Sequence, residues 1–180
     1  QQQRNDPPDA HDGEVGQAIV KATARVLHQR AAESRGTQAG TTIVQVLPVA
    51  RRNAGVASGG VERPTVIHGV APDFLRVHTW DAAAGGGFDA ADLREAAKVC
   101  VLGVTPARAL FGDGDPLGQT VTLAGVLPCR VIGVLAEKGF STSGSDLDDL
   151  VLLPITTFVG HLSDRIGYSY IEVEPSSAKL

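Results

Sequence analysis

"KVCVLGVTPARALFGDGDPLGQTVTLAGVLPCRVIGVLAEKG", residues 98–139, places a strand, a helix and a hairpin in immediate succession. The run VCVLG at 99–103 is short, apolar and rich in valine, which is typical of a buried strand. Thr105 and Pro106 are residue types preferred at the cap and the first position of a helix, and Gly112 is placed to end that helix. This order predicts a mixed α/β domain.

The glycine-rich loop inside this stretch, within residues 109–125, raises the question of a phosphate cradle. Phosphate loops place their glycines before a helix N-terminus, where backbone amides face the anion, whereas this loop follows a helix and leads into a strand. Asp113 and Asp115 would also repel a phosphate. The loop therefore reads as a connection, followed by two strands around a tight Ala124-Gly125 turn.

Upstream, residues 14–34 carry apolar side chains at steps of three and four, which predicts an amphipathic helix packed on a sheet. The β-branched segment 41–50 predicts a strand that is broken by Pro48. The polar, glycine-rich residues 51–64 predict a hairpin arm with a mobile tip, and the strand resumes at Thr65.

Downstream, Asp89 is placed to cap a short helix, with Asp92 in the capping-box position. Residues 136–149 form a long polar segment and predict a loop. The segments 150–158 and 168–174 then predict two further strands.

The composition is that of a globular protein and lacks the clustered positive charge that is typical of nucleic-acid binding. The 180 residues are 43% hydrophobic and carry 16 basic against 20 acidic side chains, a net charge of −4 with no run of Lys or Arg. No stretch of about 18 apolar residues and no basic-apolar leader occurs, so the sequence as given predicts neither a membrane span nor an export signal. The 4% aromatic content predicts a monomer in isolation, because aromatic side chains dominate interface hot spots.

Cys100 and Cys129 each sit inside an apolar, strand-like run and have no metal or redox spacing. They are expected to be small buried hydrophobes, with a disulfide between them as the alternative in an oxidising compartment. A cysteine nucleophile is not favoured, since it would need an exposed and activated thiolate. The histidines are scattered singly and show no ligand spacing, at His11, His28, His68, His78 and His161.

An acidic cluster, Asp146, Asp148 and Asp149, stands at the end of the polar loop. It lacks the glycine and the bidentate glutamate of a calcium loop, so solvation and capping of the next strand are the favoured interpretation. The loop formed by residues 138–149 also carries Phe140, and recognition is often borne by such surface loops. We therefore predict that Phe140 and the three aspartates contact a partner.

Four stretches, taken in order, resemble a known family. They are HGVAPDFLRVHTW (68–80), GGGFDAAD (85–92), residues 98–139 and DLDDLVLLPITTF (146–158). The succession V-L-G, A-x-x-L-F-G, D-P-x-G, V-x-G-V-L and V-L-L-P-x-T-T is similar to the MacB-like periplasmic core domain. That domain lies between the first two transmembrane helices of many ABC-transporter permeases of the macrolide and lipoprotein exporter type. The resemblance covers about half of the chain.

The resemblance implies an α+β fold with two mixed α/β lobes. Residues 13–79 and 160–180 would form a membrane-proximal porter-like lobe, and 80–159 an inserted second lobe. Residues 1–12 are polar, carry a proline pair and show no periodicity, so their composition predicts a disordered terminus. The resemblance also implies an extracytoplasmic, periplasmic domain of a bacterial inner-membrane protein, next to transmembrane helices and a separate ATPase domain.

The resemblance further implies a domain that holds no cofactor or metal and does no chemistry. Such a domain would couple cytoplasmic ATP hydrolysis to substrate export through conformational change and contact with an adaptor or another partner. The alternative is a free-standing secreted module of the same fold that binds a small ligand between its lobes.

Overall fold

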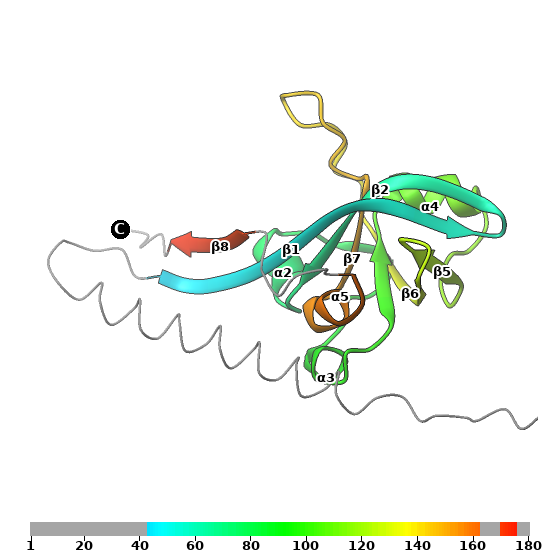
Figure 1. The fold of residues 1–180 in the computed structure, drawn as a ribbon. Helices are drawn as coiled ribbons and strands as arrows, with labels where there is room; N and C mark the ends of the chain where they lie inside the picture. Colours follow the sequence, from blue (N-terminus) through cyan, green and yellow to red (C-terminus); the bar gives the residue numbers. More distant parts are fainter. Residues whose placement is uncertain (1–42, 163–169, 176–180) are drawn as a thin grey trace, which may run out of the picture.

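A computed structural model describes residues 43–162 and 170–175. Strands predominate in this part of the chain (Figure 1). The elements in chain order are β1 (Ile43–Ser58), β2 (Val61–Val70), α2 (Phe74–Val77), β3 (Ala82–Gly85), α3 (Ala90–Arg94), β4 (Val99–Leu102), α4 (Val104–Phe111), β5 (Thr120–Leu123), β6 (Leu127–Leu135), β7 (Leu150–Pro154), α5 (Ile155–Leu162) and β8 (Tyr170–Pro175). The predicted disordered terminus and the predicted helix at 14–34 lie outside the described residues.

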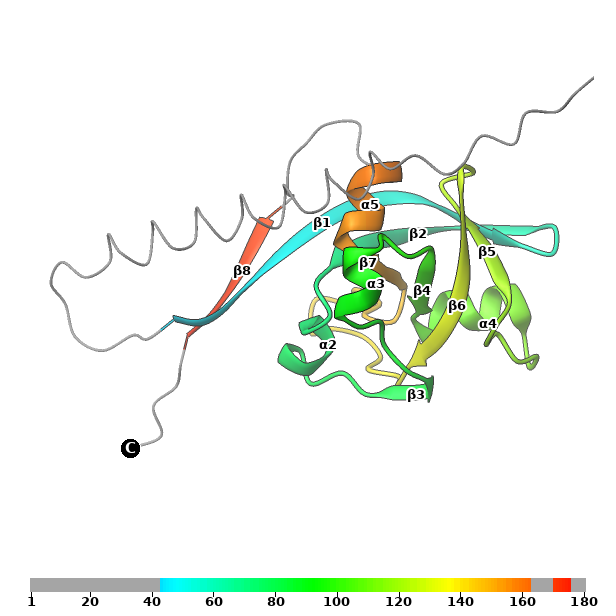
Figure 2. The ribbon, with the colours of Figure 1, turned by 90° about the horizontal axis from the view of Figure 1, so that it is seen from below.

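Six strands form a ring of hydrogen-bonded neighbours, in the order β1-β2-β7-β4-β6-β5 and back to β1. The pairs β2–β7 and β4–β6 are parallel, and the other four are antiparallel. β3 pairs with β6 outside this ring, and β8 pairs antiparallel with the first half of β1 (Figure 2). Closure gives each ring strand a partner on both sides.

The core consists of two clusters on opposite faces of the strands. On β4, Cys100 and Leu102 belong to the first cluster, while Val99 and Val101 belong to the second. α5 adds Phe158 to the first cluster, which fixes one face of that helix against the strands. β4 is thus buried on both faces, which explains its continuous apolar run.

The strand prediction was wrong at Pro48, because β1 continues through it to Ser58. Pro48 pairs with Ile171 of β8, whereas the pairing of β1 with β2 starts only at Ala50. Proline lacks a donor and is tolerated where a strand has an unpaired side. The predicted hairpin in this region is confirmed, with its turn between Ser58 and Val61.

The predicted strand at 150–158 is also partly wrong, since it ends at Pro154 and helix α5 begins at Ile155. Ile155, Phe158 and Leu162 recur at helical spacing and are all buried. The hydroxyl of Thr157 donates to the Ala97 carbonyl (2.8 Å) and so anchors the helix. Tertiary packing here overrides the strand preference of Ile-Thr-Thr.

Other local predictions are confirmed. The Asp89 carboxylate accepts bonds from the amides of Ala91 (2.8 Å) and Asp92 (3.0 Å), and the Asp92 carboxylate accepts one from the Asp89 amide (2.9 Å). Ala124 and Gly125 both have positive φ and are the two central residues of a tight turn in which the Val126 amide donates to the Leu123 carbonyl (3.1 Å). The described part of the predicted strand at 168–174 lies in β8.

The prediction for the start of α4 was wrong in one detail. Gly103 is the N-cap residue and Thr105 lies inside the first turn, so Thr105 does not cap the helix. The Thr105 hydroxyl instead donates to the Asp146 carboxylate (2.8 Å). Gly112 does end the helix, with φ of 58°.

Strands of the two predicted lobes are hydrogen-bonded to each other. β2 belongs to the predicted membrane-proximal segment, yet it pairs along its second half with β7 of the predicted inserted segment. The change of partner occurs in the middle of β1, which pairs with β8 before Ala50 and with β2 from Ala50 onward. The two-lobed division with a boundary at residue 80 stays a prediction.

Candidate functional site

The loop at residues 138–149, which we call the arm, joins β6 to β7 and stands away from the strands (Figure 1). Its two sides are paired. Phe140 and Asp146 form an isolated antiparallel bridge, and the Leu147 amide donates to the Gly139 carbonyl (2.9 Å). The arm is therefore a small hairpin and not an irregular loop.

Serines close the tip of the arm. The Ser141 amide donates to the Ser145 carbonyl (2.8 Å), and the Ser145 amide donates back to the Ser141 hydroxyl oxygen (3.0 Å). Gly144 adopts φ of 82° and donates to the Ser141 carbonyl (2.9 Å), which makes the tight turn. The tip is thus ordered by its own hydroxyl and backbone groups.

Asp148 closes the base of the arm. Its side chain is buried, with 3% of the residue surface exposed. One carboxylate oxygen accepts the Lys138 amide (2.8 Å) and the other accepts the Gly139 amide (2.7 Å). Hydrogen bonds of this charge-assisted kind are stronger than neutral ones, so Asp148 ties the two sides of the arm together.

The other two aspartates connect the arm to the body of the domain. Asp146 accepts the Thr105 hydroxyl of α4 (2.8 Å) and the Asp148 amide (2.8 Å). Asp149 accepts bonds from Arg63 (2.8 Å) and Thr65 (2.8 Å), both on β2. The predicted site residues thus divide: the three aspartates meet at the base of the arm, and Phe140 stands apart with 73% of its surface exposed.

A second contact beside the base was missed from the sequence. The Lys138 ammonium lies 4.4 Å from the centre of the Trp80 ring and donates to the His78 carbonyl (2.8 Å). The Trp80 indole in turn donates to the Ala136 carbonyl (3.0 Å). The only available signal was the single tryptophan of the chain, because nothing in the spacing relates residue 80 to residue 138.

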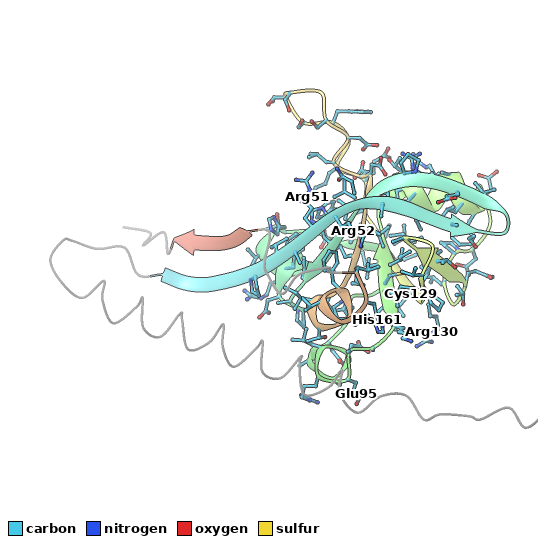
Figure 3. All side chains as sticks on the ribbon, in the orientation of Figure 1. Arg51, Arg52, Glu95, Cys129, Arg130 and His161 are labelled. Carbon is cyan, nitrogen blue, oxygen red and sulfur yellow. The ribbon has the colours of Figure 1, made fainter. Side chains whose placement is uncertain are left out.

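His68, on β2, is the described histidine whose environment changes its titration. Burial, helped by the charges of Arg51 and His78, lowers the pKa of His68 from 6.5 to about 4. Its Nδ1 atom is buried and has no hydrogen-bond partner among the described residues. Arg51 stands on the neighbouring strand β1 (Figure 3). At neutral pH the His68 imidazole is therefore uncharged.

Cys100 and Cys129 are buried and are free thiols in the structure, as the prediction of small buried hydrophobes requires (Figure 3 labels Cys129). Burial raises the pKa of the Cys100 thiol well above its usual value and raises that of Cys129 to about 12. A thiol in this state is not a nucleophile.

Residues 43–162 and 170–175 contain no group of three or more His, Cys, Asp or Glu side chains arranged to hold a metal ion. Within the same residues, none of the helices has both the length and the apolar character needed to cross a membrane.

Comparison with known proteins identifies the family. Residues 4–179 match the family model of the MacB-like periplasmic core domain. The chain belongs to this family. The predicted resemblance is confirmed, and it extends over nearly the whole chain.

Relatives of the MacB-like chain agree with this assignment. It is 43% identical over 105 residues to a macrolide export ATP-binding/permease protein MacB of Rhodospirillum rubrum, an alignment that covers 58% of the chain and 16% of that protein. It is 34% identical over 137 residues to a pyoverdine export ATP-binding/permease protein PvdT of Pseudomonas syringae, covering 76% and 21%. The chain thus spans about a fifth or less of the length of these relatives.

Solved structures share the fold. The periplasmic region of MacB from Actinobacillus actinomycetemcomitans gives a TM-score of 0.63 at 24% identity, over 83% of this chain and 64% of that one. The extracellular domain of the transporter YknZ from Gram-positive bacteria gives 0.62 at 22% identity, over 76% and 67%. The mixed α/β class is therefore confirmed. The MacB-like chain is an extracytoplasmic domain of an ABC-transporter permease of the inner membrane.

Proposed function

We propose that this domain carries out no reaction itself and couples ATP hydrolysis in a cytoplasmic domain to substrate export. It would do so by changing conformation and by contacting a periplasmic adaptor or another partner protein. The observation that carries the proposal is the arm, which presents one aromatic side chain, Phe140, on a base fixed by buried and half-buried carboxylates.

The state of the thiols and of His68 supports the non-catalytic part of the proposal. Both cysteines are buried with raised pKa values, so they lack the thiolate that nucleophilic catalysis needs. The Nδ1 atom of His68 is buried within the packing of β2, which keeps it away from any substrate in solution.

The arm also indicates which chemistry its partner would have. Between Gly139 and Leu147 the only charged side chain is Asp146, and both of its carboxylate oxygens are bonded within the chain. Phe140 is 73% exposed and Leu147 39% exposed, and the remaining outward groups of the tip are hydroxyls. The partner surface would therefore be an uncharged pocket that accepts an aromatic ring.

Of the four predicted contact residues, Phe140 is the one that we propose to touch the partner directly. Asp146, Asp148 and Asp149 would act by holding the arm in its conformation, since their carboxylates are engaged with α4, the arm backbone and β2.

Photo-crosslinking in cells tests the contact. The intact transporter is produced with p-benzoylphenylalanine in place of Phe140, and the matched control carries it in place of Val126, which is 68% exposed in the β5–β6 turn. We expect an adduct with one extracytoplasmic protein from position 140 and none from position 126. Equal adducts from both positions, or none from either, would contradict the contact.

The protein found in the adduct is then purified and titrated with the 180-residue chain. Phe140→Ala is expected to weaken binding by about 10- to 100-fold, as for a buried aromatic anchor. Raising the salt from 0.1 to 0.5 M should change the affinity by less than about threefold, because residues 139–147 of the arm carry no charged side chain except Asp146, whose oxygens are bonded within the chain. A steep salt dependence would show that charged groups outside residues 139–147 carry the contact.

Coupling is tested separately in the intact transporter. Amide exchange across the described residues is compared between the nucleotide-free state and a state trapped with ATP and vanadate. We expect nucleotide to change the protection of strands in this domain, because a coupling domain must differ between the two states. Identical exchange in both states would rule out coupling through this domain.

A further inference from the structure

We infer that the arm is not an independently moving loop but forms one mechanical unit with helix α4 and strand β2. The unit is held by Asp146, Asp148 and Asp149, which we call the carboxylate clasp. The biological role of the unit rests on the proposed function. The clasp itself consists of contacts within this chain and does not need a partner.

Each member of the clasp binds a different element. Asp148 accepts two amides at the start of the arm, at Lys138 and Gly139. Asp146 accepts the Thr105 hydroxyl from α4, and Asp149 accepts Arg63 and Thr65 from β2. The Asp146 carboxylate also accepts the Asp148 backbone amide, so the side chain of one clasp residue is bonded to the backbone of another.

Backbone contacts join the same elements. The Gly103 amide, at the start of α4, donates to the Leu150 carbonyl (2.8 Å), and the Thr105 amide donates to the Asp148 carbonyl (3.4 Å). The first-turn amides of a helix need acceptors, and α4 has no side-chain cap of its own. The end of the arm, at Asp148, and the start of β7, at Leu150, supply these two acceptors, so the N-terminus of α4 is bonded to the point where the arm enters β7.

The packing leaves no room for independent movement at this junction. A side-chain carbon added at Gly103 would overlap the carbonyl group of Asp148. The Lys138 side chain fixes the other end of the arm by its contact with Trp80. A displacement of Phe140 by a partner would therefore move α4 and β2 rather than bend the arm at its base.

The coupling predicts a reciprocal effect that a merely well-ordered loop would not produce. If the arm and α4 share one opening equilibrium, a change on α4 alters the arm and a change in the arm alters α4. Loosening one without loosening the other would mean that the two are separate units.

Amide hydrogen exchange of the 180-residue chain, resolved by NMR or by short peptides, tests this without any partner. Thr105→Val removes the α4 hydroxyl, and Asp148→Asn removes one acceptor oxygen of the clasp. The matched controls are Thr142→Val, on the exposed arm tip, and Asp113→Asn, on the exposed loop after α4. Trp80 emission reports whether each variant is folded.

In the wild-type chain we expect the amides of Gly139 and Leu147 to be protected. Thr105→Val should speed their exchange by about tenfold or more although residue 105 lies outside the arm, and Asp148→Asn should speed exchange of the Thr105 amide to a similar degree. Both controls should stay within about twofold of wild type. If Asp148→Asn fails to fold, Thr105→Val alone decides the question.

Two results would overturn the inference. One is exchange of the wild-type arm at the rate of an unstructured peptide, and the other is an arm whose exchange ignores Thr105→Val. Neither result concerns partner binding. A functioning clasp combined with no adduct at Phe140 would instead reject the proposed function and leave the clasp intact.

Discussion

His68 on β2 lies directly opposite Arg51 on β1 in the antiparallel ladder, so a half-buried imidazole has a permanent positive charge as its cross-strand neighbour. Like charges placed opposite one another on a sheet are destabilising. Burial is the main reason why the pKa of His68 is lowered, and the charge of Arg51 lowers it further, so the imidazole stays neutral beside this neighbour at neutral pH.

We predict an acid-sensitive loss of stability from this pair. The pKa of His68 is about 4 in the folded chain and 6.5 when unperturbed, so between these values the unfolded chain binds more protons. The contribution of His68 to the free energy of unfolding should be constant above pH 6.5. It should decrease as the pH falls from 6.5 to 4, by up to about 3 kcal/mol. Urea unfolding at several pH values measures it.

The control for this prediction is His68→Gln, which keeps a polar side chain but does not titrate. Its free energy of unfolding should be flatter between pH 6.5 and 4 than that of the wild type. Equal slopes for the two proteins would assign the pH dependence to other groups.

The β5–β6 turn offers a stabilising substitution. Ala124 has φ of 52°, a left-handed conformation that costs energy for alanine and suits asparagine or glycine. Ala124→Asn should raise the free energy of unfolding by roughly 0.5–1 kcal/mol, measured by thermal or urea unfolding. Ala109→Gly, in the exposed part of α4, should lower it by a similar amount. A destabilised Ala124→Asn would disprove the turn assignment.

Two glycines should respond to alanine with opposite signs. At Gly103 the added carbon meets the Asp148 backbone, so Gly103→Ala should destabilise the chain by roughly 1–3 kcal/mol. Gly160 lies in α5 with open space around it, so Gly160→Ala should stabilise by roughly 0.5–1 kcal/mol. Denaturation midpoints of both variants, compared with wild type, decide this. Two changes of the same sign would contradict the close approach at Gly103.

The thiols should be inert in the native chain. Because Cys100 and Cys129 are buried with raised pKa values, a thiol reagent at pH 8 should label neither until the chain unfolds. Mass spectrometry should show two modifications in 6 M guanidinium and none in buffer. Rapid native labelling of either cysteine would mean that the strands around it open.

Monomeric behaviour is expected of the isolated chain. The closed ring gives each of its six strands a partner on both sides over part of its length, which leaves fewer edges that could join to another copy. Light scattering at micromolar concentration should give the chain mass of 18.7 kDa. Twice that mass would point to an interface elsewhere, for example along β3, which pairs only with β6 among the described strands.

The sequence predicted the parts of the fold that depend on neighbouring residues. The β4–α4–β5–β6 order followed from an apolar run, a terminating glycine and the tight turn at Ala124-Gly125, all of them local signals. Pro48 and Ile155 misled the prediction because their conformations depend on distant partners. Pro48 is tolerated because only β8 pairs there, and Ile155 is helical because its face packs on the core.

The same distinction applies to the candidate site. The residue types of the arm marked it as a recognition loop, and Phe140 is exposed. The roles of the aspartates were not readable, because Thr105, Arg63 and Trp80 reach the arm only after the chain has folded. A cluster of acids in sequence therefore turned out to be a set of internal acceptors.

β1 is one unbroken strand of 16 residues, roughly 50 Å long at about 3.3 Å per residue. Its first half pairs with β8, and its second half pairs with β2 and β5 as part of the closed ring. No loop separates the two halves. A displacement of the β8 ladder would therefore reach the ring through β1 itself, without passing through a loop.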